Sequence, residues 1–131
     1  MFGHIYRNRL YTDKMKTEEL KKLVLDALED MKALDVITLD VRDISSMTDI
    51  MVIATGTSNT HTKSVASYVF DKANAAGMKP LGMEGEDQGE WVLVDLGDIV
   101  VHVMKHDVRD FYNLEKLWSM SEETGESRLV Q

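Results

Sequence analysis

The sequence predicts an α/β domain with a single mixed β-sheet of about five strands and helices packed against it. Segments with apolar residues at helical spacing alternate with short β-branched runs, in the order α-β-β-α-β-β-β-α. The 131 residues contain no internal repeat and no linker, and this length suits one domain with a substantial core. We expect the domain to span residues 15–119, followed by a flexible polar tail over residues 120–131.

The first fourteen residues differ in charge from the rest of the chain. Three basic residues outnumber one acidic residue there, whereas the whole chain has a net charge of −8. A helix start follows at once, with Thr17 as the predicted N-cap. We expect residues 1–14 to be an N-terminal extension or an added leader that precedes a natural start at Met15. A basic arm that contacts RNA is the alternative.

The segments up to residue 83 give two helices and three strands. Residues 36–42 alternate as a strand does, and residues 50–55 form a continuous apolar run that is typical of a central strand. A second helix is capped by Ser58 or Asn59 and ends at Gly77. Residues 78–83 form a short predicted strand that holds the only proline, which indicates an edge position or the start of a strand. The first helix presents a predicted core stripe of Leu20, Leu23, Val24, Ala27, Leu28, Met31 and Leu34.

Two β-rich runs on either side of Leu96-Gly97 predict a β-hairpin. With those two residues as the turn, Asp95 lies opposite Asp98, Val94 opposite Ile99 and Trp91 opposite His102. One face is then aliphatic and is the predicted core: Val92, Val94, Ile99, Val101 and Val103. The other face is mixed: Trp91, Leu93, Asp95, Asp98, Val100, His102 and Met104. Aromatic side chains among polar groups are typical of recognition surfaces, but packing under a second layer of helices explains this face equally well.

A third helix is predicted directly after the hairpin. Asp107 is its predicted N-cap, and Phe111, Leu114 and Trp118 fall on one apolar stripe. Tyr112 and Glu115 lie on the neighbouring stripe.

The composition indicates which kind of partner the protein binds and in which cellular compartment it acts. The pI is about 4.9 and no basic run is present, so we expect no direct sequence-specific binding to nucleic acid. An acidic domain suits a basic protein partner, although the same charge also keeps a domain in solution. No apolar run is long enough to cross a bilayer, and we expect a cytoplasmic protein.

Catalytic and metal-binding patterns are weak. The chain has neither cysteine nor a GxSxG motif, which argues against nucleophilic catalysis. His102 and His106 straddle a strand end and a helix start rather than one helix face, and Glu84 and Glu86 lie in an acidic loop where carboxylates are usually solvated. We therefore predict no enzyme, no metal and no cofactor. The alternative is an enzyme, a nucleotidyltransferase or nucleotide-binding protein, that uses the turn at Gly56–Asn59 and nearby carboxylates.

Three long segments carry a resemblance to a known family. They are SSMTDIMVIATGTS (Ser45–Ser58), PLGMEGEDQGEWVLVDLGDIVVHVM (Pro80–Met104) and RDFYNLEKLW (Arg109–Trp118). From about Lys16 to Trp118 the chain resembles the ribosomal silencing factor family, also called the Iojap family. The resemblance implies a nucleotidyltransferase-like fold without that activity.

The same resemblance implies a function in translation. Members bind a basic protein of the large ribosomal subunit, large-subunit protein fourteen, on the face where the small subunit docks. They thereby block subunit joining and repress translation under nutrient limitation, and they form homodimers off the ribosome. By resemblance, the contact surface comprises Met83, Glu84, Gly85, Trp91, Asp95, Asp98, His102, Tyr112, Glu115 and Trp118. A place in the core is the alternative for the two tryptophans, and more strongly for Trp118.

Overall fold

A computed structural model describes the fold of residues 2–123 and the side chains of residues 16–118. Its helices are α1 (Phe2–Asp30), α2 (Asn59–Ala75), α3 (His106–Tyr112) and α4 (Leu114–Glu123). Its strands are β1 (Leu34–Asp40), β2 (Ile50–Gly56), β3 (Gly82–Glu84), β4 (Trp91–Asp95) and β5 (Ile99–Lys105). The predicted α/β class with one five-stranded sheet is confirmed. Among the helices described, none combines the length and the apolar character needed to cross a membrane.

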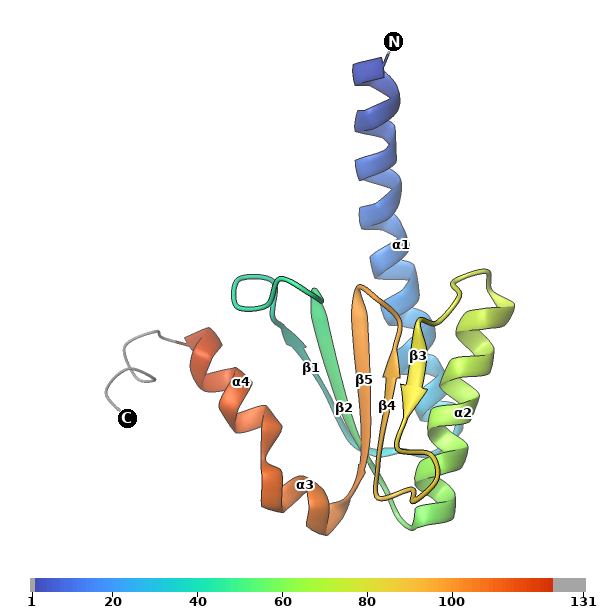
Figure 1. The fold of residues 1–131 in the computed structure, drawn as a ribbon, viewed down its shortest axis with the longest axis vertical. Coiled ribbons are helices and arrows are strands. Elements are labelled where there is room, and N and C mark those ends of the chain that lie inside the picture. The colour runs from blue at the N-terminus through green and yellow to red at the C-terminus, as the bar shows by residue number, and fades with distance from the viewer. Residues whose placement is uncertain (1, 124–131) are drawn as a thin grey trace.

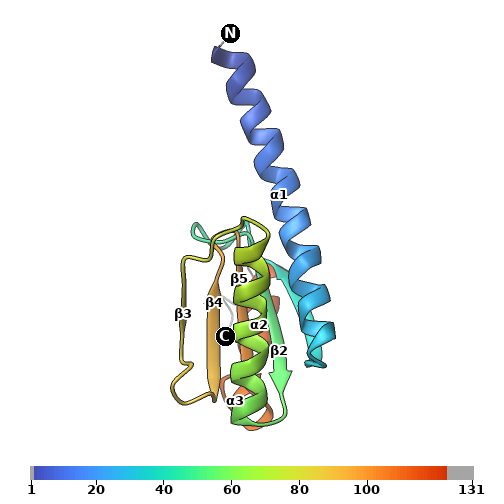
Figure 2. The same ribbon diagram turned by 90° about the vertical axis from the view of Figure 1, so that its right-hand side faces the viewer.

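The sheet is mixed and has helices on both faces. Its strand order is β1-β2-β5-β4-β3, with β2 parallel to β5 and all other neighbours antiparallel. α1 and α2 lie on one face, and α3 and α4 lie on the other (Figure 1). A quarter turn of the view shows α2 running along the middle of the sheet, with α1 beside it and projecting beyond the strands (Figure 2).

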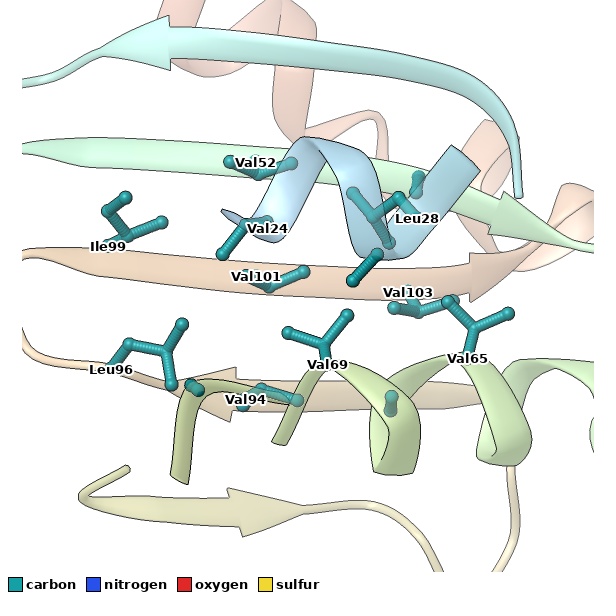
Figure 3. Close-up of a cluster of buried hydrophobic side chains, with 14 of the residues drawn as sticks. Val24, Leu28, Val52, Val65, Val69, Val94, Leu96, Ile99, Val101 and Val103 are labelled. Carbon is teal, nitrogen blue, oxygen red and sulfur yellow. The ribbon is translucent and has the colours of Figure 1, made fainter. Parts of the chain in front are cut away.

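The main core lies between the sheet and the α1–α2 layer (Figure 3). Val24 and Leu28 of α1 and Val65 and Val69 of α2 are fully buried there. Each such side chain contributes roughly 1.5–3 kcal/mol when it leaves water. All members of the predicted aliphatic hairpin face are fully buried in this core, which confirms that prediction: Val92, Val94, Ile99, Val101 and Val103.

The predicted hairpin register was wrong, because the turn lies one residue later in the chain and each strand partner is shifted by two residues. Leu96 N donates to Ile99 O at 2.9 Å, so Gly97 and Asp98 form the two-residue turn. Gly97 has a φ of 87°, and only the first turn residue has a positive φ, as a type II′ turn requires. Asp95 therefore lies opposite Val100, Val94 opposite Val101, and Trp91 opposite Met104. The strand residues keep their predicted faces, because moving the turn by one residue shifts each partner by two and so preserves the alternation of side chains. Two residues at the turn differ: Leu96 joins the main core, and Asp98 leaves the mixed face for the turn.

The amino-terminal helix starts earlier and ends sooner than predicted. α1 is continuous from Phe2 to Asp30, so Thr17 lies inside it and is not an N-cap. The buried Thr17 hydroxyl instead donates to Asp98 Oδ2 at 2.8 Å, which ties the helix to the hairpin turn. After Lys32, which has a φ of 59°, Leu34 begins β1 rather than ending the helical stripe.

The predicted third helix is two helices. Asn113 adopts the left-handed conformation (φ 49°, ψ 52°) and separates α3 from α4, so Phe111, Leu114 and Trp118 do not share a stripe. Phe111 is 79% exposed, whereas Leu114 and Trp118 pack against the sheet. Lys105 occupies the N-cap position without a side-chain cap bond, and Asp107 lies in the first turn. The predicted tail overlaps α4 to Glu123, and residues 124–131 lie outside the described part of the chain.

A second, smaller core lies under α3 and α4. Val41, Met51, Ile53 and Met104 are its buried members. α3 and α4 make their main contacts with β1, β2 and β5. Over β3 and β4, this face of the sheet therefore lies outside the area that α3 and α4 mainly cover.

Candidate partner-binding surface

One part of the sheet carries polar and aromatic side chains without a full helix layer above it. We call this the open sheet face and define it as Glu84, Trp91, Leu93, Asp95 and Val100. The strand pairs Glu84–Leu93 and Asp95–Val100 place these side chains on one face of the sheet. Glu84 is exposed and the other four are half-buried. The face thus offers apolar area flanked by carboxylates.

A cluster of aromatic rings borders the open sheet face. The Trp91 indole donates from Nε1 to His102 Nδ1 at 2.9 Å, and the Tyr112 ring lies 5.0 Å from the Trp91 ring, centroid to centroid. Phe111 packs edge-on against Tyr112 with centroids 4.9 Å apart. Tyr112 is 54% exposed, so the outer rings of the cluster are available to a partner.

His102 is buried next to this cluster and accepts the hydrogen bond of the Trp91 indole as a neutral side chain. It is only 6% exposed, and burial lowers its pKa to about 4. Because Nδ1 accepts the indole hydrogen, the neutral ring carries its proton on Nε2. His102 therefore orients Trp91 rather than offering a charge to a partner.

An acidic hollow adjoins the cluster. It has a volume of about 430 Å³ and is lined by Gly85, Asp87, Gln88, Glu90, Trp91, Val108 and Tyr112. Its loop is well anchored, since Gly89 N donates to Gly85 O at 3.0 Å and Asn59 Nδ2 donates to Gln88 O at 2.9 Å. Gly85 has a φ of 90°, and a Cβ there would collide with the Trp91 carbonyl oxygen. Carboxylates beside aromatic rings suit a guanidinium or ammonium group.

The structure brings six of the ten predicted contact residues to this surface. They are Glu84, Gly85, Trp91, Asp95, His102 and Tyr112. Within this group, Asp95 also accepts from Gly97 N at 2.9 Å and so helps to form the hairpin turn.

The other four predicted residues lie elsewhere or are engaged within the fold. Met83 pairs with Val94 on the opposite face and packs against the main core. Asp98 lies in the turn and accepts the Thr17 hydroxyl. Both Glu115 oxygens accept hydrogen bonds from Arg109, and Trp118 packs in the second core.

Two residues of interest had not been singled out as site residues. Phe111 was expected on a buried stripe, and the signal against that was Asn113, a residue type that tolerates the left-handed conformation. Arg109 is 6% exposed and donates hydrogen bonds to residues of three other elements, β1, β2 and α4. An arginine among acidic helix residues gives no sequence signal for burial.

The turn at Gly56–Asn59 serves the fold. Of the two predicted caps of α2, Ser58 and Asn59, the structure shows Ser58, whose hydroxyl accepts from His61 N at 3.0 Å. Thr57 N donates to His61 Nδ1 at 2.9 Å, so a side chain of the helix itself binds at this turn. Across the described residues, no group of three or more histidine or acidic side chains is arranged to hold a metal ion.

Comparison with known proteins identifies the family. The family model described as "Ribosomal silencing factor during starvation" matches residues 14–130. The ribosomal silencing factor of Chromobacterium violaceum is 48% identical over 104 residues, which cover 79% of this chain and 85% of the relative. A crystal structure of a protein from C. violaceum matches with a TM-score of 0.77 at 48% identity, covering 78% of this chain and 85% of that one.

A more distant relative is named for a ribosomal role in an organelle. The Mus musculus protein "Mitochondrial assembly of ribosomal large subunit protein 1" is 30% identical over 101 residues, covering 75% of this chain and 44% of that protein. The family match spans most of the chain, and the similarity to the bacterial relative spans most of both proteins. This chain belongs to the ribosomal silencing factor family.

Proposed function

We propose that this chain is a non-enzymatic translation repressor that acts on the large ribosomal subunit. It binds a basic ribosomal protein there, large-subunit protein fourteen, and blocks joining of the small subunit when nutrients are scarce. The observation that carries the proposal is the open sheet face with its adjoining acidic hollow, in a chain of the ribosomal silencing factor family. The protein then acts in the cytoplasm, where the subunits join.

The chemistry of the surface favours a basic protein partner. Trp91 and Tyr112 supply large apolar rings, which are the side chains that most often dominate binding energy at interfaces. Asp87 and Glu90 line the same hollow and complement a cationic side chain. The net charge of −8 attracts a basic protein and disfavours approach to bare phosphates.

The mechanism we propose is occlusion, which requires no chemistry on the ribosome. A bound domain of 14.9 kDa at the joining face prevents the small subunit from docking by its bulk alone. The name of the mouse relative, which refers to assembly of the large ribosomal subunit, supports a large-subunit target.

A homodimer off the ribosome is part of the proposal. The exposed Phe111 and Tyr112 rings leave an apolar edge that a second copy can cover. If the dimer uses the same surface, it competes with the ribosome, so a Tyr112 variant should weaken both associations.

Sedimentation with purified subunits tests the function. We expect the protein to co-sediment with free large subunits and to inhibit their joining to small subunits, as followed by light scattering. If a several-fold excess of folded protein leaves joining unchanged, the proposed function is wrong.

A charge-reversal pair tests the surface. Glu84→Lys with Asp87→Lys should weaken binding to large subunits by at least about tenfold, because two attractive carboxylates become repulsive. Glu29→Lys with Asp71→Lys makes the same charge change at exposed positions on the α1–α2 layer and should leave most of the affinity. Equal losses from the two pairs would mean that overall charge, and not this surface, governs binding.

A further inference from the structure

Arg109 is a buried cation whose bonds join four elements of the fold. Its Nη1 donates to Asp35 O at 2.7 Å and to Thr55 Oγ1 at 2.8 Å, which anchors α3 to the start of β1 and the end of β2. Its Nε and Nη2 donate to the two carboxylate oxygens of Glu115 at 2.8 and 2.9 Å. This fork-to-fork geometry is the most directional ion pair available to side chains.

The ion pair spans the break between α3 and α4. Arg109 lies four residues before the left-handed Asn113, and Glu115 lies two residues after it. The hydrogen bonds from Arg109 lower the pKa of Glu115, so the carboxylate stays ionised at neutral pH. The pair therefore fixes the angle between α3 and α4. We call this junction the elbow, and a single left-handed residue forms its bend.

The exposed side of α3 carries two aromatic rings at the border of the open sheet face, those of Phe111 and Tyr112, which we call the aromatic rim. Phe111 and Tyr112 lie two and three residues after Arg109 in α3, and both are exposed while Arg109 is buried. The Tyr112 ring packs on the Trp91 ring, and both residues line the acidic hollow. Any rotation of α3 about the elbow therefore moves Tyr112 relative to Trp91 and changes the shape of the hollow.

We propose that Arg109 and Glu115 form a latch that positions Phe111 and Tyr112 for the ribosomal partner, without either charged group contacting that partner. This inference rests on the proposed function. It assigns Glu115 a positioning role, in place of the direct contact expected from the family resemblance.

Opposite charge changes give the decisive test. Arg109→Gln removes a positive charge and Glu115→Gln removes a negative one. If the two groups acted on a basic partner through charge, the first change would strengthen binding and the second would weaken it. The latch predicts that both changes weaken binding to free large subunits, each by about tenfold, with an unchanged dependence on salt concentration.

Conservative variants separate the geometry of the pair from its charge. Arg109→Lys keeps the charge but loses the two-pronged geometry, so it should weaken binding nearly as much as Arg109→Gln. Glu115→Asp keeps the carboxylate on a shorter stem and should give an intermediate loss. The matched controls are Arg42→Gln and Asp40→Asn, which alter an exposed ion pair of 2.6 Å and should leave binding unchanged.

The affinities are measured at a temperature where circular dichroism shows each variant to be folded. Hydrogen exchange over residues 106–118 should be faster in the Arg109 and Glu115 variants, as expected if the elbow loosens. Wild-type affinity in Arg109→Gln and Glu115→Gln, or changes of opposite sign, would overturn the latch. Failure of the wild-type protein to bind large subunits would instead overturn the proposed function.

Discussion

The two faces of the sheet differ in composition although the same strands build both. The face under α1 and α2 is aliphatic and closed, and the five hairpin side chains that the sequence assigned to it are fully buried. The other face mixes aromatic, acidic and imidazole groups and is only partly covered by α3 and α4. Since successive strand residues point to opposite faces, one hairpin can hold the fold together and present a recognition surface. Substitutions on the two faces should therefore have different consequences.

The largest predicted contrast comes from adjacent residues of β5. Val101→Lys places an unpaired charge in the main core and should cost more than about 4 kcal/mol, enough to unfold much of the protein. Val100→Lys projects from the half-covered face opposite Asp95, where the new cation has a partner. It should cost no more than about 1 kcal/mol.

Urea unfolding of both variants, followed by circular dichroism, measures this contrast. Comparable losses of stability in Val100→Lys and Val101→Lys would show that the open sheet face is as essential to the core as the closed one.

The second prediction concerns pH and the buried His102, which contacts Trp91 of the open sheet face. The folded-state pKa of His102 is about 4, whereas an unfolded histidine titrates near 6.5. The unfolded chain therefore takes up the proton first as the pH falls. The free energy of unfolding should be highest above pH 6.5 and should decrease by up to roughly 3 kcal/mol between pH 6.5 and pH 4.

A His102→Gln variant serves as the control, because it keeps an acceptor for the Trp91 indole and cannot titrate. Urea unfolding between pH 5 and pH 7 should show a flatter pH dependence for this variant. The upper part of the range matters most, since carboxylates elsewhere in the chain contribute below pH 5. Identical profiles for both proteins would assign the pH dependence to other groups.

The smallest expected effect concerns the exposed Tyr112 ring beside the acidic hollow. Tyr112→Ala should reduce affinity for large subunits by about 1–2 kcal/mol, because it removes a ring that packs on Trp91 beside the acidic hollow. Leu81→Ala is the matched control, since Leu81 is an apolar side chain that is 73% exposed and does not line the hollow. Titration with labelled protein gives both affinities, and equal values for the two variants would remove Tyr112 from the contact surface.

The sequence predicted those features that depend on local alternation. The two faces of the hairpin follow from the side-chain period of two, so they survived a turn placed one residue too early. A cap at Ser58 or Asn59 was predicted because a side-chain oxygen before a helix has a local partner, and the structure shows that it is Ser58. Part of the aromatic–acidic surface could be predicted, because Trp91 and His102 lie within one hairpin and Glu84 lies in the segment just before it.

Predictions that depended on contacts between distant segments fared less well. Thr17 was expected to cap a helix, yet its hydroxyl bonds Asp98, eighty-one residues away in the chain. Glu115 was expected to face a partner, but its carboxylate is held by a buried arginine that also binds the ends of two strands. These contacts form only once the sheet has assembled, so local pattern carries little information about them.

The sequence by itself determined the α/β class, the order of most elements and the division of the hairpin into an aliphatic and a mixed face. Periodicity encodes these features, and burial of apolar surface enforces them. Only the tertiary structure decided that Asn113 bends the last helix, that Arg109 fixes the bend and that the exposed rings gather beside an acidic hollow. The physical reason is that a buried ion pair and a ring stack depend on positions in space, which no local pattern in the chain specifies.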